Sequence, residues 1–193
     1  CGYSGFRVAK RLLAKGFKIT ATTRNPGRQA DLQAAGCQTE VLDVNDKTTL
    51  SKISGFLDKG SRVLLSIPSL TVTANNITHY EDPTARIVKA LRDAPARVVY
   101  LSTTGVYGDT GQVDEETPIA PVTERQFCRA EAENAIVEQL WSSLILRPAA
   151  IYGPNRGIHC VIREKSFRLA GKGTNFISRI HVEDLAALIV AAL

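Results

Sequence analysis

Apolar positions along the chain follow two spacings, and each spacing predicts one kind of secondary structure. Apolar residues three or four positions apart, as in helices, recur over 8–13, 28–35, 47–57, 83–93, 123–140 and 182–193. Alternating or continuous apolar runs rich in β-branched residues, as in strands, occur over 17–23, 39–42, 62–67, 96–102 and 143–147. Gly16 and Gly36 each separate a helix from the next strand, and Thr123 is the expected N-cap of the longest helix.

Helices separate most of the predicted strands, and this order predicts an α/β fold. Parallel neighbouring strands need a crossover connection of about a dozen residues or more, which the helices supply. The strands are nearly continuous apolar runs, as expected when helices cover both faces of a sheet. Residues 105–121 are instead rich in Gly, Asp, Glu, Thr and Pro, so we predict a long surface loop of the kind that often carries function.

Composition is that of a soluble globular domain and excludes several classes of protein. The chain has 193 residues, 44% of them hydrophobic and 22% charged, with a net charge of +5. Its basic residues are dispersed without an aromatic-basic stripe, so we do not expect a nucleic-acid partner. No apolar run approaches the roughly 20 residues that span a bilayer, so we do not expect a membrane protein.

The cysteines and the missing methionine bear on compartment and completeness. Cys1, Cys37, Cys128 and Cys160 lack metal-ligand spacing, so we expect reduced thiols, no metal site and a cytoplasmic protein. The chain contains no Met, and the helix over 182–193 stops without a capping residue. We therefore expect a fragment that lacks both termini. An organelle address remains the alternative to the cytoplasm, because targeting signals lie at the N-terminus.

The glycine-rich opening predicts a phosphate-binding turn. Gly2, Tyr3, Ser4 and Gly5 stand directly before a helix, where Gly2 and Gly5 match the second and third glycines of a G-x-G-x-x-G turn. Such a turn lets a pyrophosphate approach the backbone and the positive end of the helix dipole. A plain tight turn is the alternative interpretation.

The residues at the end of the strand predicted over 17–23 and in the turn after it favour NADP over NAD as the cofactor. Thr23 and Arg24 stand where NAD-specific proteins carry an acidic residue, and Arg28 follows across a turn. Both guanidinium groups are suited to a 2′-phosphate, whereas the alternative for Arg24 is a solvated loop charge. Further cofactor contacts are predicted at the carboxyl ends of strands, with turn formation as the alternative: Asp43, Val44, Ser66 and Ile67.

Four segments together resemble a known superfamily: Cys1–Gly5, Tyr100–Gly108, Leu146–Pro154 and Ser178–Ala186. In order and spacing they resemble an atypical extended short-chain dehydrogenase/reductase of the NAD-dependent epimerase/dehydratase type. The resemblance implies a Rossmann-type doubly wound parallel sheet over 1–193 without its first strand, and only the beginning of a small C-terminal substrate domain. Residues 153–180 would contribute to this incomplete substrate-binding region. The resemblance also implies cofactor contacts at Ser102, Pro148, Ala149 and Ile151.

The catalytic positions implied by the resemblance are unusual in this chain. The family uses a Ser or Thr with a Tyr and a Lys four residues apart on one helix, where the ammonium lowers the pKa of the phenol. Thr103 matches the hydroxyl position, but Arg125 stands at the Tyr and Arg129 at the Lys. Arginine stays protonated because its pKa is above about 12, so Arg125 is not an ordinary proton shuttle. We expect both arginines to face the cofactor or an anionic substrate; the alternative is a solvated helix face with Arg129 paired to Glu133.

Three other residues are candidates for the missing proton donor: Tyr107, Tyr152 and His181. We prefer Tyr107, for which aromatic packing beneath the loop is the alternative. His181 is expected to form a local hydrogen bond at a helix start.

The resemblance predicts an NADP-preferring oxidoreductase or epimerase/dehydratase-like enzyme, with NAD as the alternative cofactor. The expected substrate is a small anionic or nucleotide-linked molecule. The competing hypothesis is a non-catalytic redox sensor that binds the dinucleotide, and a third is an interaction protein on a degenerate scaffold. A homodimer is expected through the helix over 123–140.

Overall fold

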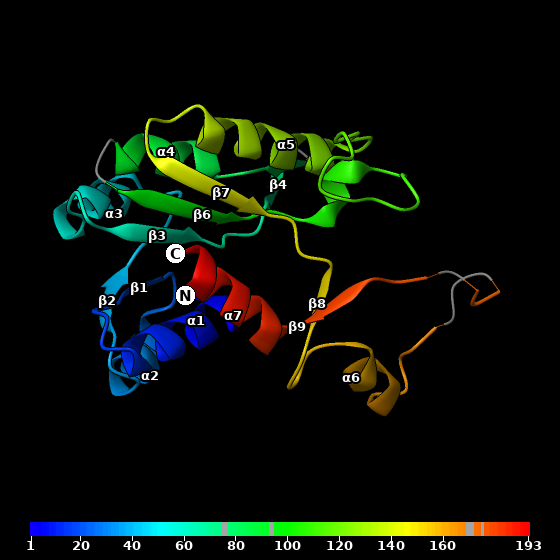
Figure 1. The fold of residues 1–193 in the computed structure, drawn as a ribbon, viewed down its shortest axis with the longest axis horizontal. Coiled ribbons are helices and arrows are strands. Elements are labelled where there is room, and N and C mark those ends of the chain that lie inside the picture. The colour runs from blue at the N-terminus through cyan, green and yellow to red at the C-terminus, as the bar shows by residue number, and fades with distance from the viewer. Residues whose placement is uncertain (75–76, 93–94, 169–171, 175) are drawn as a thin grey trace.

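The computed structural model describes residues 1–74, 77–92, 95–168, 172–174 and 176–193 (Figure 1). Its α-helices are α1 (Tyr3–Ala14), α2 (Gln29–Ala34), α3 (Lys47–Leu50), α4 (Thr84–Leu91), α5 (Glu124–Val137), α6 (Ile158–Arg163) and α7 (Val182–Ala192). Short 3₁₀ helices are η1 (Pro26–Arg28), η2 (Ser51–Phe56) and η3 (Thr104–Tyr107). The strands are β1 (Thr20–Thr23), β2 (Gln38–Val41), β3 (Arg62–Leu65), β4 (Leu70–Ala74), β5 (Ile77–Glu81), β6 (Arg97–Leu101), β7 (Ser142–Leu146), β8 (Ala150–Tyr152) and β9 (Arg179–His181).

Three parallel strands form the centre of the molecule in the order β3-β6-β7. β6 pairs through Tyr100 with Leu65 of β3 on one side and Ile145 of β7 on the other. β1 and β2 form a second parallel pair, and β8 and β9 a third. Within the described residues, the antiparallel strand pairing is that of the β4-β5 hairpin.

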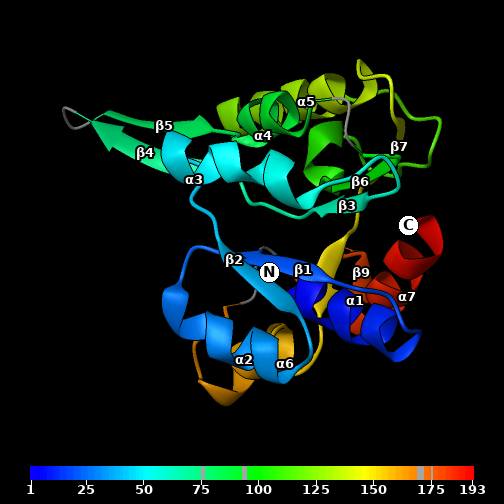
Figure 2. The same ribbon diagram turned by 90° about the vertical axis from the view of Figure 1, so that its left-hand side faces the viewer.

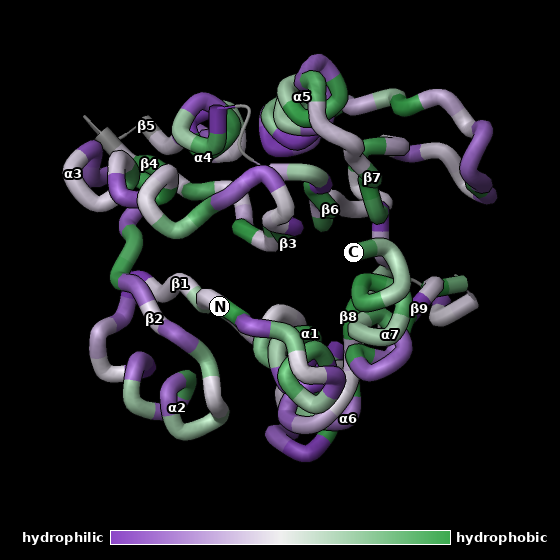
Figure 3. The backbone as a smooth tube through the Cα atoms, turned by 60° about the vertical axis from the view of Figure 1, so that its left-hand side comes forward, coloured by the Kyte–Doolittle hydropathy of each residue, from purple (hydrophilic) through white to green (hydrophobic). Residues whose placement is uncertain are grey.

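Helices cover both faces of the three-stranded sheet, with α4 and α5 on one face and α1 and α7 on the other (Figure 1). Alternate residues of β6 serve the two faces: Val98 and Tyr100 join the core under α4 and α5, while Leu101 joins the core with α1 and α7. Figure 3 shows α7 as a largely hydrophobic helix beside α1. The expected doubly wound, Rossmann-type α/β fold is therefore confirmed.

The helix termini follow the local chemistry that the sequence predicts. Thr123 caps α5 by accepting a hydrogen bond from the amide of Gln126, whose side chain caps in return. Gly16 and Gly36 have φ of +83° and +97°, which suits glycine where a helix turns into the next strand. His181 accepts from the amide of Glu183 through Nδ1 at 3.4 Å, which confirms the expected local hydrogen bond.

The β4-β5 hairpin is absent from the predicted elements. It projects beyond the three-stranded sheet in Figure 2 and pairs Leu70 with Glu81 at its base. The sequence signal is the alternation of Thr with apolar residues along β4. The predicted strand over 62–67 ends at Leu65 instead, because Pro68 has no amide for a ladder and the chain turns into the hairpin.

Several predicted boundaries also shift. The strand expected over 17–23 begins only at Thr20, where pairing with β2 starts, and Phe17 is exposed. The helix expected over 47–57 divides into α3 and η2. The helix expected over 83–93 ends at Leu91, and Asp93 lies outside the described residues.

Residues 153–180 contain α6 and lead into β9. Positions 169–171 and 175 within this range lie outside the described residues. Among the helices that the structure describes, none is long and apolar enough to cross a membrane.

Candidate cofactor and active site

The N-terminus of α1 is free of side-chain capping and of acidic residues. Gly2 is the N-cap residue and supplies no side-chain acceptor to the first turn, which is formed by Tyr3, Ser4 and Gly5. A Cβ atom added at Gly2 would meet nothing within 4 Å, so the backbone here is open to approach. The first amides of a helix and its dipole favour a negative group at such an end. The geometry therefore suits an anion.

The glycine turn lies against the carboxyl end of β1. The backbone nitrogen of Cys1 donates to the carbonyl of Thr22 in β1. The glycine turn therefore lies beside the end of β1, where Thr23 and Arg24 stand.

A network of short-range hydrogen bonds shapes the turn after β1. The Thr23 hydroxyl accepts from the amide of Asn25 at 3.2 Å, and Asn25 Oδ1 accepts from the amide of Gly27 at 2.9 Å. Arg24 and Arg28 are both exposed on this turn. Two guanidinium groups therefore flank a fixed turn beside the start of α1.

The end of β2 adjoins this turn, because Leu42 donates its amide to the carbonyl of Thr23 at 3.0 Å. Asp43 accepts a hydrogen bond from the amide of Asn45 at 2.9 Å. One oxygen of this carboxylate therefore forms a turn, which is the alternative to the predicted cofactor contact. Val44 is 4% exposed and packs in the core, which leaves only its backbone for a cofactor.

The ends of β6 and β7 form the second half of the site. The Ser102 amide donates to the carbonyl of Leu146 at 2.8 Å, and the Thr104 amide donates to Pro148 at 3.4 Å. Thr103 Oγ1 accepts from the amide of Gly105 at 3.1 Å. The Ser102 hydroxyl is buried and has no hydrogen-bond partner among the described residues, so this edge retains an unused polar atom.

The remaining predicted contacts are distributed around this edge. Ser66 is exposed directly after β3, and Ile67 is half-buried. Ala149 is half-buried between β7 and β8. Ile151 packs in the hydrophobic cluster with α1 and α7, so its side chain faces other apolar side chains. The cofactor roles of these residues stay predictions.

Arg129 is buried, and its guanidinium is held by other residues of the protein. It forms an ion pair with Asp82, in which Nη1 lies 3.1 Å from Oδ2. The other acceptors of its guanidinium are the Ile67 carbonyl, the Ser69 hydroxyl and the Tyr100 hydroxyl. The alternative pairing with Glu133 is wrong, because Glu133 pairs with Arg147. Arg125, one turn earlier, is exposed and has no ion pair with the described residues.

Tyr107 is 6% exposed and lies between two partners. Arg147 Nη1 donates to the Tyr107 hydroxyl at 2.9 Å, and this hydroxyl donates to the carbonyl of Asp114 at 3.2 Å. Hydrogen bonds to Glu133 raise the pKa of Arg147, so this guanidinium remains charged. Tyr107 therefore anchors the loop that follows it, as expected if it packs beneath that loop. Its catalytic role stays a prediction.

We expect the Tyr107→Phe variant to lose about 1–3 kcal/mol of unfolding free energy, because a buried hydroxyl bonded to a charged group is removed. Urea denaturation measures this loss. Tyr152→Phe is the control, since Tyr152 is exposed and its hydroxyl has no bond to the described residues. Equal stability of the two variants would contradict the anchoring role.

Sequence reasoning missed the partners that hold these side chains: Asp82, Tyr100, Glu133 and Arg147. Glu133 and Arg147 carry a weak signal, because one follows Arg129 by a single helical turn and the other ends an apolar strand. Asp82 precedes a proline in a segment with no predicted element, and nothing in its surroundings along the chain indicates a buried ion pair.

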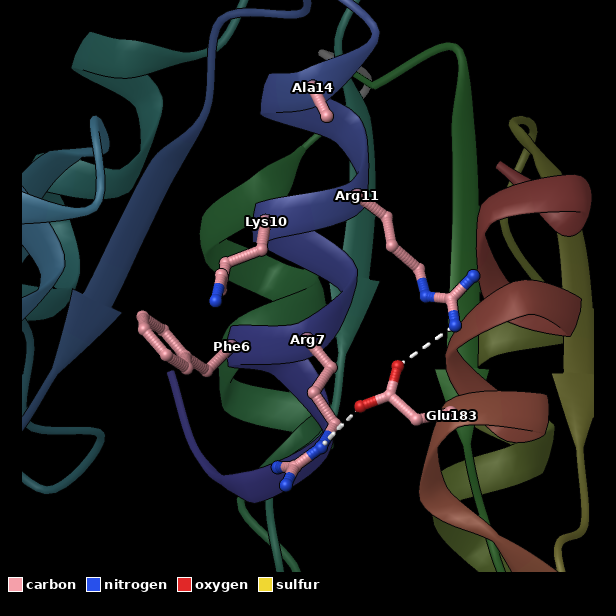
Figure 4. Close-up of a pocket in the computed structure, with 6 residues that line it drawn as sticks. All are labelled: Phe6, Arg7, Lys10, Arg11, Ala14 and Glu183. Atoms are coloured by element: carbon pink, nitrogen blue, oxygen red, sulfur yellow. Dashed lines mark hydrogen bonds and ion pairs between the residues drawn. The ribbon is translucent and has the colours of Figure 1, made fainter.

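A cavity of about 460 Å³ lies along the outer face of α1 against the first turn of α7 (Figure 4). Its charged lining is Arg7, Lys10, Arg11 and Glu183. Figure 4 shows Arg7 and Arg11 pointing to the two oxygens of Glu183, at 2.9 and 2.8 Å. Hydrogen bonding from Arg11, and then from Arg7, lowers the pKa of the Glu183 carboxyl. These contacts join α1 to α7.

The comparisons with known proteins agree with one another. A family model described as "NAD dependent epimerase/dehydratase family" matches residues 1–193. The chain is 24% identical over 196 residues to Protein YeeZ of Escherichia coli (strain K12), covering 100% of this chain and 70% of YeeZ. A functionally unknown conserved protein from Silicibacter pomeroyi DSS has 28% identity and a TM-score of 0.75, covering 98% of this chain and 64% of that one.

The fold is also that of a UDP-glucuronic acid 4-epimerase from Bacillus cereus, whose structure is a complex with UDP-glucuronic acid and NAD. The identity is 18% and the TM-score 0.75, over 99% of this chain and 70% of the epimerase. The chain therefore spans between 64% and 70% of the length of these relatives. Among the described residues, no group of three or more His, Cys, Asp or Glu gathers as a metal site.

Proposed function

Because the chain belongs to the NAD-dependent epimerase/dehydratase family, we propose that it binds a nicotinamide dinucleotide, with NADP preferred over NAD. We further propose that it acts on a small anionic or nucleotide-linked molecule, as an oxidoreductase or an epimerase/dehydratase-like enzyme. The observation that carries the proposal is the uncapped α1 N-terminus, open over Gly2, beside a turn that exposes Arg24 and Arg28.

The residues present fit such a cofactor. The pyrophosphate would meet the first turn of α1, where backbone amides and the helix dipole favour negative charge. Arg24 and Arg28 would hold the 2′-phosphate through charge-assisted hydrogen bonds. The orphaned Ser102 hydroxyl at the end of β6 offers a polar contact to the other half of the molecule. The chemistry that the cofactor supplies when bound is reversible hydride transfer.

The proton chemistry falls to residues other than those on α5. A guanidinium group is a poor proton donor and acceptor, so Arg125 and Arg129 do not replace the Tyr of the family in proton transfer. Thr103 uses an oxygen lone pair to accept from Gly105, which leaves its own proton free for a substrate oxygen. Tyr107 would take part only after its bond to the Asp114 carbonyl opens. We assign Thr103 as the residue that orients the substrate.

We expect the Arg24→Ala variant to bind NADP about 10- to 100-fold more weakly, because a charge-assisted contact to the 2′-phosphate is worth about 1.5–3 kcal/mol. Its affinity for NAD should change less than about threefold, since NAD lacks that phosphate. Calorimetric titration of both nucleotides measures the two effects. Lys18→Gln is the control, since it removes an exposed charge before β1. Equal binding of NAD and NADP by the unmodified protein would refute the preference.

The second candidate function is a non-catalytic redox sensor. It is favoured by the engagement of Arg129 and Tyr107 with protein partners, which leaves neither side chain free to contact a substrate. Loss of NADPH absorbance with a panel of carbonyl substrates separates the two functions. Tight NADPH binding with no turnover on any substrate supports the sensor. The homodimer through α5 remains a prediction for either function.

A further inference from the structure

The buried guanidinium of Arg129 closes the base of the β4-β5 hairpin. Its acceptors lie on both sides of the hairpin: Ile67 and Ser69 precede β4, and Asp82 follows β5. Ser69 also donates to the Asp82 carboxylate at 3.4 Å. The hairpin therefore leaves and rejoins the fold at a single charged clamp.

The clamp is buried, and its guanidinium contacts four other groups of the protein. The side chains of Arg129 and Asp82 are 8% and 4% exposed, and Nη1 and Nη2 both contact the Ile67 carbonyl, at 3.2 and 3.3 Å. The Tyr100 hydroxyl is another partner of Nη1, and burial raises the pKa of this phenol, so it remains neutral. A planar guanidinium can serve these acceptors together, whereas a lysine ammonium has three donors at one point.

The clamp lies where the proposed cofactor would cross the sheet. With the pyrophosphate at α1 and the 2′-phosphate at Arg24, the nicotinamide half must extend the other way, over the ends of β3 and β6. Ser66 and Ile67 directly follow β3 at this edge of the sheet, and the Ile67 carbonyl accepts a hydrogen bond from Arg129.

We infer that Arg129 is a positioning residue, which fixes the segment 66–69 and the hairpin base as one wall of the nicotinamide site. This inference rests on the proposed function. At the position where the resemblance implies a Lys that lowers the pKa of a Tyr, the chain carries an arginine paired with Asp82. In this inference α5 therefore holds a wall of the site in place and supplies no proton.

The test compares Arg129→Lys with Arg92→Lys, which makes the same change at an exposed residue after α4 that belongs to no predicted site. Arg129→Lys retains a positive charge beside Asp82, so it is expected to fold. We expect it to bind NADPH about tenfold more weakly, and to lose the change in nicotinamide fluorescence on binding, since the wall is no longer held. Binding of adenosine 2′,5′-bisphosphate, which lacks the nicotinamide half, should stay within about twofold of the unmodified protein. Arg92→Lys should match the unmodified protein with both ligands.

Hydrogen exchange tests the clamp without any ligand. Exchange over 66–74 should be faster in Arg129→Lys than in Arg92→Lys or the unmodified protein. Unchanged exchange, or equal weakening of both ligands, overturns the inference. If the unmodified protein binds neither NADPH nor adenosine 2′,5′-bisphosphate, the proposed function fails together with the role toward the cofactor. The exchange experiment still decides in that case whether Arg129 holds the hairpin base.

Discussion

We expect the Asp82→Ala variant to lose about 3–5 kcal/mol of unfolding free energy, because Arg129 would remain charged and buried without a counter-ion. The Arg129 side chain is 8% exposed, so water cannot replace the missing carboxylate without opening the fold. Denaturation in urea, with the midpoint and slope both fitted, measures the loss.

Glu81→Ala is the matched control, since Glu81 is the neighbouring carboxylate and pairs with Arg86. Both members of that pair are substantially exposed, at 43% and 37% of their side chains. An exposed pair contributes about 0–1 kcal/mol, so the control should remain close to the unmodified protein. Replacing Arg129 by Met in the Asp82→Ala background should restore part of the stability, because it removes the unpaired charge. Equal losses of unfolding free energy in the Asp82 and Glu81 variants would show that the buried pair stabilises the protein no more than the exposed pair.

Gly108→Ala should destabilise the protein by more than about 2 kcal/mol, because two independent costs combine at this position. Gly108 has a φ of +62°, which is unfavourable for any residue with a Cβ atom. A Cβ atom there would lie 2.1 Å from the Ala120 carbonyl oxygen, so the backbone of the loop must move. That movement would break the hydrogen bond from the Ala120 amide to the Val106 carbonyl, which is 2.9 Å long.

Gly111→Ala is the control within the same loop. A Cβ atom at Gly111 meets nothing within 4 Å, and its φ lies outside the left-handed region. We expect its thermal midpoint to stay near that of the unmodified protein, while Gly108→Ala melts several degrees lower. Limited proteolysis within 109–121 should also accelerate in the Gly108 variant alone. Two variants with the same midpoint would mean that the loop adapts without cost.

Local signals in the sequence predicted the elements that depend on neighbouring residues. The α5 cap at Thr123, the helix-to-strand glycines and the alternation of helix with strand all follow from interactions a few residues apart. The parallel sheet followed as well, because the crossover lengths leave few alternatives. Residues 3–5 of the predicted glycine turn form the first turn of α1 and do not precede the helix, and their role in binding phosphate stays a prediction.

The hairpin and the buried ion pairs were not predictable in this way. The Arg129–Asp82 pair joins residues 47 positions apart, and the Arg147–Glu133 pair connects a strand end to the inner face of α5. Along the chain, Arg125 and Arg129 are one helical turn apart and should repel each other. Glu133, one turn after Arg129, looks like the partner of Arg129. Only packing shows that Arg129 pairs with Asp82 and that Glu133 pairs with Arg147.

The sequence by itself determined the fold class, the helix caps and the positions of the glycine turn and of Thr103, because these depend on local propensity and on motif spacing. The tertiary structure decided which charged side chains pair with other residues of the protein and which remain exposed to a ligand. Arg129 and Tyr107 are occupied by the fold, while Arg24 and Arg28 are exposed. The reason is physical: a buried charge must be neutralised by whatever the packing brings within a few ångströms, and chain order alone does not specify that neighbour.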